Sequence, residues 1–92
     1  MLEDTVKNDL MQYLENTGKD YIDFEQLEEI FSHDELEISD EDGWHGIDAI
    51  WVEDGEFYAS YTDEDGDEDT DVIVFTNDEL IRLNKWLKRN IV

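Results

Sequence analysis

The sequence predicts an α+β domain with the element order ααβββα. Apolar residues recur every three to four positions near both ends of the chain, whereas they alternate with polar residues in the middle. Two Asp-Gly dipeptides punctuate that middle part, as in β-hairpins. Ninety-two residues suffice for one small core, so we expect residues 1–92 to form a single acidic domain.

Two helices are predicted in the N-terminal third. The first covers residues 2–17, because apolar side chains share one helical face there and Gly18 stands where a helix would end. The second covers about residues 23–32, with Asp23 as its N-cap and Glu25 in its first turn. In residues 33–43 apolar side chains alternate with acidic ones, so this segment could form either a short edge strand or a loop.

Three antiparallel strands are predicted near residues 47–53, 56–63 and 68–75. Asp54-Gly55 and Asp65-Gly66 are each typical of a two-residue type I′ turn. Two such turns would pair Val52 with Phe57, and Ala59 with Val72. The apolar face of the sheet would then carry Ile50, Val52, Phe57, Ala59, Tyr61, Val72 and Val74. The other face would be half apolar, with Trp51, Tyr58, Ile73 and Phe75.

A third helix is predicted over about residues 78–91. Thr76 and Glu79 stand at the spacing of a capping box. One helical stripe consists of Leu80, Leu83, Leu87 and Ile91. The opposite side carries Arg82, Lys85, Lys88 and Arg89, which we expect to complement the helix dipole and to be dispensable for binding a target.

The carboxylates are distributed unevenly along the chain. There are 28 Asp and Glu against 6 Lys and Arg, a formal net charge of −22. Residues 20–79 hold 24 of the acids (28 less Glu3, Asp4, Asp9 and Glu15) and no Lys or Arg. Solubility needs a net charge of only a few units, so the excess indicates a negative surface with a function. Direct binding of nucleic acid is excluded and anionic membranes are disfavoured, because both need clustered cations.

Acidic side chains on a folded sheet can imitate a phosphate backbone. Side chains on one face of a strand recur about every 6.6–6.8 Å. Phosphates of duplex DNA rise about 3.4 Å per nucleotide along each strand, and the winding of the backbone lengthens this interval to a comparable one. A DNA-binding protein could therefore accept such a surface in place of DNA.

In size, charge and absence of cysteine the chain resembles the small acidic DNA-mimic inhibitors of phages and mobile elements, such as anti-restriction, anti-CRISPR and uracil-DNA glycosylase inhibitor proteins. The resemblance covers the whole chain but is one of composition, without a shared motif. It implies a stoichiometric inhibitor that occupies the cationic groove of a nucleic-acid-binding protein or nuclease. Such an inhibitor would act in the cytoplasm of a bacterial host, as a monomer or a homodimer.

The densest acidic runs are the expected partner-binding residues, because they project from turns that a groove could receive. They are Asp63, Glu64, Asp65, Asp67, Glu68 and Asp69, followed by Asp40, Glu41 and Asp42. Trp44 is a further candidate, since Gly43 and Gly46 bound it closely. Its indole either folds back over the core or stands exposed as an interface anchor.

Two other classes of function remain open. An immunity or antitoxin protein would block a basic nuclease toxin through the same electrostatic field, with aromatic anchors such as Trp44 or Trp51 supplying affinity. A calcium-binding module would use the Asp-rich turn, but the EF-hand spacing fails. With Gly66 at position 6 of that loop, Tyr61 falls at position 1 and Val72 at position 12.

We expect no enzyme activity, metal site or cofactor. Twenty-eight carboxylates single out no catalytic pair. His33 and His45 lack the spacing of a ligand pair and are expected in loops. The chain has no cysteine for a thiolate site. Its longest apolar runs, such as Ala49-Ile50-Trp51-Val52, are far shorter than the ~20 residues that span a bilayer.

Overall fold

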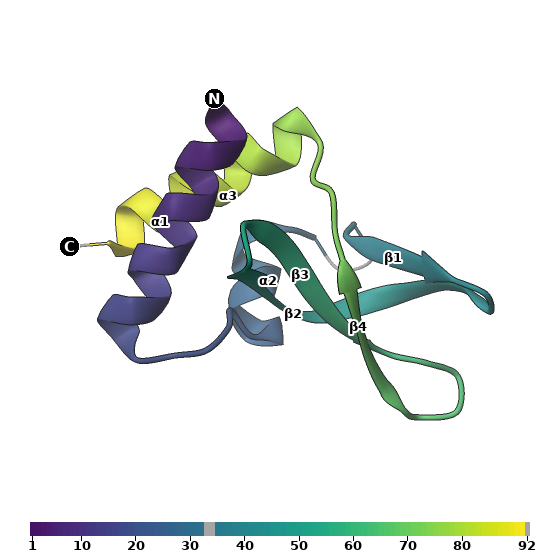
Figure 1. Ribbon diagram of the computed structural model, residues 1–92. Coiled ribbons are helices and arrows are strands. Elements are labelled where there is room, and N and C mark those ends of the chain that lie inside the picture. Colours follow the sequence, from purple (N-terminus) through teal and green to yellow (C-terminus); the bar gives the residue numbers. More distant parts are fainter. Residues whose placement is uncertain (33–34, 92) are drawn as a thin grey trace.

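The computed structural model describes residues 1–32 and 35–91, and this part of the chain forms an α+β fold (Figure 1). Its elements are α1 (Leu2–Thr17), α2 (Phe24–Ile30), β1 (Glu37–Asp40), β2 (Gly43–Glu53), β3 (Glu56–Thr62), β4 (Glu68–Val72) and α3 (Asn77–Asn90). The strands form one antiparallel sheet in the order β1-β2-β3-β4. The predicted class is confirmed, but the predicted order ααβββα lacks one strand. None of the described helices is long and apolar enough to cross a membrane.

The predicted helix boundaries rest on local capping interactions. Asp23 accepts a hydrogen bond from the backbone N–H of Gln26 at 3.0 Å, and the Gln26 side chain accepts one from the backbone N–H of Asp23. Thr76 and Glu79 form the same reciprocal capping box at the start of α3. Gly18 ends α1 with a φ of 71°, a left-handed conformation that glycine adopts without a steric penalty.

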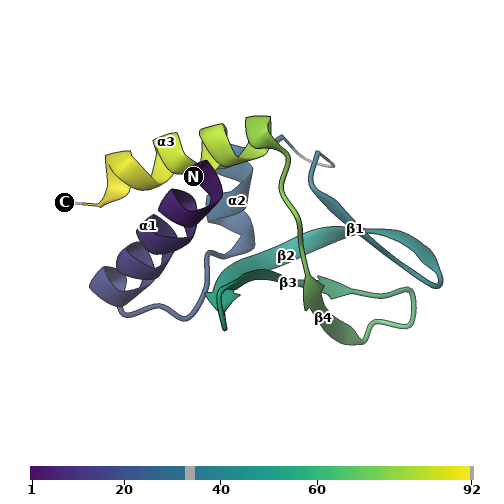
Figure 2. The ribbon, with the colours of Figure 1, turned by 45° about the horizontal axis from the view of Figure 1, so that its top comes forward.

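Helices α1 and α3 pack against each other, α1 and α2 contact β2, and the three helices lie over one end of the sheet (Figures 1 and 2). The Tyr13 ring meets the Trp86 ring edge to face, with their centroids 5.1 Å apart. Trp86 lies outside the predicted stripe of α3, yet it is buried. The side chains with no exposed surface include Val6, Leu10, Ile22, Ile50, Leu83 and Leu87.

Residues 33–43 were expected to form either a short edge strand or a loop, and the described part of this segment contains an edge strand, β1. Residues 37–40 form an edge strand that pairs with the start of β2, and Ile38 is buried. Asp40 pairs with Gly43, so residues 41–42 make the turn. The backbone N–H of Asp42 donates to the Asp40 carboxylate at 2.8 Å. His33 lies outside the described residues.

The register between β2 and β3 is as predicted from Ala49 to Glu53, and an irregularity between Ile47 and Ala49 shifts it by one residue beyond that point. Val52 pairs with Phe57, and Ile50 pairs with Ala59. The connecting residues Asp54 and Gly55 have φ values of 51° and 78°, as a type I′ turn requires.

The predicted register between β3 and β4 is wrong by one residue. Ala59 pairs with Asp71 rather than with Val72, because the loop after β3 spans residues 63–67 instead of two residues. A one-residue shift turns every side chain of a strand to the other face. Ile73 and Phe75 are therefore buried, whereas Val72 and Val74 are exposed.

The core gains aromatic contacts from this register. The Phe75 ring lies 4.9 Å from the Phe57 ring in an edge-to-face arrangement, and 6.4 Å from the Phe31 ring. Phenylalanine buries more apolar area than valine, so the observed register places the larger side chain in the core.

The basic side of α3 is only partly a free surface. Arg82 Nη1 lies 2.6 Å from Glu35 Oε1, and Nη2 donates to the backbone carbonyl of Ile30 at 2.8 Å. Arg82 therefore joins α3 to the C-terminal end of α2. Lys85, Lys88 and Arg89 are exposed, in agreement with the predicted helix face.

Candidate acidic interface

Two acidic turns lie at the end of the sheet that extends past the helices (Figures 1 and 2). One is the turn between β1 and β2, and the other is the loop between β3 and β4. We call them together the acidic end, which consists of Asp40, Glu41, Asp42, Asp63, Glu64, Asp65, Asp67, Glu68 and Asp69. These are the acidic residues that the sequence predicts to bind a partner.

The first turn is held by His45, which lies on β2 rather than in the expected loop. Its Nε2 lies 2.8 Å from Asp40 Oδ1, and its ring stacks on the Tyr61 ring at a centroid distance of 5.2 Å. Glu41 and Asp42 remain exposed at the tip. The hairpin is therefore anchored at its base while its charges face solvent.

The electrostatics connect the two turns. The hydrogen bond to Asp40 raises the pKa of His45, and Glu64 and Asp42 raise it further. The same hydrogen bond lowers the pKa of Asp40. Burial raises the pKa of Tyr61, and the charges of Asp40 and Asp69 add to this effect. Carboxylates of both turns thus act on the same two rings.

The second turn is stabilised by its own aspartates. Asp63 Oδ1 accepts hydrogen bonds from the backbone N–H groups of Asp65 and Asp67, each at 2.9 Å. The backbone N–H of Asp63 donates to the carbonyl of Asp67, which closes the loop. Gly66 adopts a φ of 85°, the left-handed conformation that glycine favours. Every acid after Asp63 in this loop and in β4 is exposed.

Three carboxylates of this loop converge in space. Oxygens of Asp63, Asp65 and Asp67 lie within 4.8 Å of one another. Carboxylate oxygens are the ligands that Ca²⁺ and Mg²⁺ prefer. However, exposed acidic groups commonly cluster without a cation, and Asp63 already accepts two hydrogen bonds from its own loop.

Trp44 is 70% exposed on β2, where it pairs with Ser39. The alternative in which its indole covers the core is therefore wrong. A hollow of about 360 Å³ lies beside it and is lined by Glu35, Leu36, Glu37, Trp44, Ile73, Val74 and Glu79. Trp44 thus combines apolar surface with adjacent negative charge, which suits an interface anchor.

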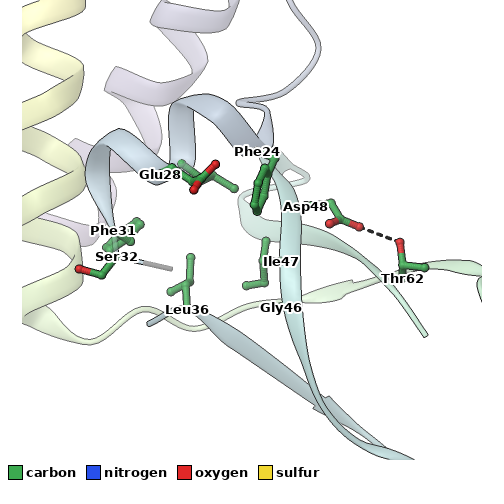
Figure 3. A pocket seen from close by; sticks show the side chains of 10 residues that line it. Phe24, Glu28, Phe31, Ser32, Leu36, Gly46, Ile47, Asp48 and Thr62 are labelled. Carbon is green, nitrogen blue, oxygen red and sulfur yellow. Dashed lines mark hydrogen bonds between the residues drawn. The ribbon is translucent and has the colours of Figure 1, made fainter. Parts of the chain in front are cut away.

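A smaller pocket of about 260 Å³ lies between α2 and the start of β2 (Figure 3). Phe24 of α2 and Phe31, the residue after this helix, line the pocket together with Leu36 and Ile47. At its rim the Thr62 hydroxyl donates to Asp48 at 2.9 Å. The carboxylates of Glu28 and Asp48 also line this pocket, beside its apolar side chains.

Sequence reasoning missed the role of His45 and Tyr61 in organising the acidic end. The signal was present, because Asp42-Gly43 is a third Asp-Gly dipeptide and marks the turn that brings Asp40 and His45 together. Tyr61 was placed correctly on the core side of the sheet, and it is buried.

Comparison with known proteins finds no matching family model, no matching curated protein and no matching solved structure.

The pair of His45 and Asp40 predicts a pH-dependent stability. The folded-state pKa of His45 is raised, so its contribution is complete below the unfolded value of about 6.5 and is lost as the pH rises through the folded value. The folded-state pKa of Asp40 is lowered, so its contribution is complete above about 4 and is lost as the pH falls through the folded value. The pair should therefore stabilise the hairpin most between about pH 4 and pH 6.5.

Urea unfolding of the parent and of His45→Gln, followed by tryptophan fluorescence at pH 5.5 and pH 8.5, would measure this effect. We expect the parent to lose more stability than the variant on going to pH 8.5. Asp42→Asn is the control. Asp42 raises the pKa of His45 only through its charge, whereas Asp40 holds the hydrogen bond, so this variant should largely retain the parent's pH dependence. An identical loss in parent and His45→Gln would contradict the assignment.

Proposed function

We propose that this protein is a stoichiometric inhibitor that imitates nucleic acid and occupies the cationic groove of a nucleic-acid-binding protein or nuclease. The observation that carries the proposal is the convergence of both acidic turns at one end of the fold (Figure 1). The chain between residues 20 and 79 supplies no Lys or Arg to neutralise this end. A basic groove would therefore meet a predominantly negative field.

The spacing of the carboxylates supports mimicry in particular. Asp69 and Asp71 share one face of β4, and alternate residues of a strand lie about 6.6–6.8 Å apart. All five residues of β4 are exposed, so its carboxylates are accessible to a partner. Two carboxylates held at this interval by a hydrogen-bonded strand resemble neighbouring phosphates more closely than acids on a disordered tail would.

The test is competition in solution. The protein would be used to capture its target from a bacterial lysate at low salt, and the target would be identified after elution with a salt gradient. Purified target should release its DNA or RNA when the inhibitor is added. EDTA should be present throughout, because divalent cations would neutralise the acidic end.

We expect the dissociation constant to rise at least about tenfold when the salt concentration goes from about 50 mM to about 200 mM. The reason is that salt screens the exposed ion pairs and opposes the release of counterions that accompanies binding. Binding that does not respond to salt, or that leaves nucleic acid bound to the target, would contradict the proposal.

A second candidate function is immunity against a basic nuclease toxin. Exposed Trp44 favours it, because an aromatic side chain at the acidic end could anchor in a pocket of the toxin. In that case the inhibitor would cover the active site without copying the shape of DNA. Truncation of Trp44 distinguishes the two mechanisms, as described in the Discussion.

A further inference from the structure

The face of the sheet opposite the buried side chain of Ile50 carries a row of aromatic side chains. Ile22 pairs with Ile50 through two backbone hydrogen bonds of 2.9 and 3.1 Å. In antiparallel pairing this bridge places Tyr21 beside Trp51 on the opposite face from the two isoleucines. Trp51 in turn pairs with Tyr58, and their rings stack with centroids 6.1 Å apart.

The row continues to the edge of the sheet. Tyr58 pairs with Val72, which is exposed. Tyr21, Trp51, Tyr58 and Val72 therefore cross the sheet in one line. Tyr21 is 49% exposed, and Trp51 is half-buried.

A groove of about 620 Å³ lies next to this row. Ala49 and Ser60 pair with each other there, and both are buried. Their short side chains leave the hollow open between the larger aromatic residues. Its volume falls within the range of about 300–1,000 Å³ that binding pockets occupy.

The groove is ringed by negative charge. Among the described residues that line it there is no Lys or Arg, and five carboxylates border it: Asp20, Asp23, Asp48, Glu53 and Glu68. Glu53 accepts a long hydrogen bond from the Trp51 indole at 3.5 Å, so a carboxylate lies at the edge of an aromatic ring. This charge excludes anionic ligands and favours a cation.

Glu68 belongs both to the groove and to the acidic end. The groove therefore continues the proposed inhibitor surface along the outer face of the sheet. A protein seated on the acidic end would have part of its basic surface close to the groove.

The combination of flat rings and carboxylates selects arginine. A guanidinium stacks on aromatic faces and binds carboxylates in its plane, whereas a lysine ammonium is a compact and strongly hydrated charge. The chain itself contains this arrangement elsewhere. The Arg82 guanidinium lies 5.1 Å from the Phe31 ring centroid while it binds Glu35.

We propose that this groove binds an arginine side chain of the basic protein that docks on the acidic end. The proposal rests on the proposed function for the identity of that protein. The guanidinium stacks on the rings of Tyr21 and Trp51, and the carboxylates of Asp20 and Glu53 form ion pairs with it. The acidic end attracts any basic surface through its electrostatic field, whereas the groove recognises one particular side chain and so adds specificity.

The first test uses the purified chain and short blocked peptides as probes. A tetrapeptide with two arginines, one with two lysines in the same places, and spermidine are titrated separately at equal salt. The indole N–H resonances of Trp51, Trp44 and Trp86 report on the groove, the acidic end and the core. We expect the arginine peptide to shift Trp51 more than the other two indoles, and to bind about threefold more tightly than the lysine peptide.

Matched variants locate the effect. Asp20→Asn with Glu53→Gln should weaken the shift of Trp51 several-fold. Asp54→Asn with Glu56→Gln changes the net charge equally, beside the groove but outside it, and should weaken the shift less. Tyr21→Leu keeps an apolar side chain but removes the ring, so it should abolish the preference for arginine. Because Tyr21 is half exposed, this variant should fold like the parent.

Several results would overturn the proposal. They are an unmoved Trp51 indole, equal affinity for the lysine peptide or spermidine, and equal weakening by the two double variants. None of these measurements requires the cellular target or nucleic acid. Failure of the groove is thus distinguishable from failure of the proposed function, which the competition with nucleic acid tests separately.

Discussion

A variant in which three loop aspartates and one aspartate of β4 are neutralised should inhibit its target at least about tenfold more weakly than the parent, because small contributions from exposed charges add up across a patch. The substitutions are Asp63→Asn, Asp65→Asn, Asp67→Asn and Asp69→Asn. Asparagine retains a side-chain carbonyl, so residue 63 can still accept the two backbone hydrogen bonds that shape the loop. The variant therefore removes charge while it preserves the turn.

The matched control removes four acids from the helices. Its substitutions are Asp4→Asn, Glu15→Gln, Glu25→Gln and Glu29→Gln. All four residues are exposed on α1 or α2, away from the acidic end. Both variants have a net charge of −22 + 4 = −18, so a general loss of electrostatic attraction would affect them equally. We expect the control to inhibit nearly as well as the parent.

Inhibition of the identified target and circular dichroism of each variant provide the measurement. Equal weakening by both variants would mean that only the overall charge matters and that mimicry is wrong. If the loop variant inhibits normally while Trp44→Ala abolishes inhibition, the anchored interface of an immunity protein replaces mimicry. Because Trp44 is 70% exposed, its truncation should not unfold the chain.

Ile73→Ala should lower the free energy of unfolding by about 2–5 kcal/mol, the usual range for truncating a buried isoleucine. Val74→Ala, one residue along, should change it by less than about 0.5 kcal/mol. The difference follows from exposure, since Ile73 is 7% exposed and Val74 is 87% exposed. Urea unfolding followed by tryptophan fluorescence would measure both values.

The two neighbouring substitutions test the register of β4 directly. The register expected from two-residue turns places Val74 in the core and Ile73 outside, and it predicts the opposite order of effects. Phe75→Ala extends the test, because Phe75 contacts Phe57 and Phe31 and should be as sensitive as Ile73. A larger effect at residue 74 than at residue 73 would show that the observed register is wrong.

The sequence alone was sufficient to predict that the three helices form and approximately where they begin and end. Their signals are local: an apolar stripe, an N-cap three residues before its partner, and a glycine where the helix ends. Asp23, Thr76 and Gly18 each act within their own turn of the chain, so no distant contact was needed to predict their roles. The total charge and its concentration in residues 20–79 are likewise properties of the sequence.

The turns show where local reasoning stops. Asp54-Gly55 occupies the centre of a two-residue turn, Asp65-Gly66 lies inside a five-residue loop, and Asp42-Gly43 is displaced by one position from the centre of its turn. The same dipeptide therefore marks a turn without determining its length. For β4 the packing of Phe75 against rings from β3 and from the end of α2 agrees with the longer loop, and those rings are distant in the sequence.

The acidic end, too, is predictable from the sequence only in part. Its residues could be identified from the sequence, because runs of like charge are visible without a structure. Their convergence could not, since it depends on the register of β1 with β2 and on the contact of His45 with Tyr61 across the sheet. The groove beside Trp51 depends on the bridge between Ile22 and Ile50. Composition and local periodicity thus determine which elements form and what charge they carry, whereas long-range packing determines which side chains meet.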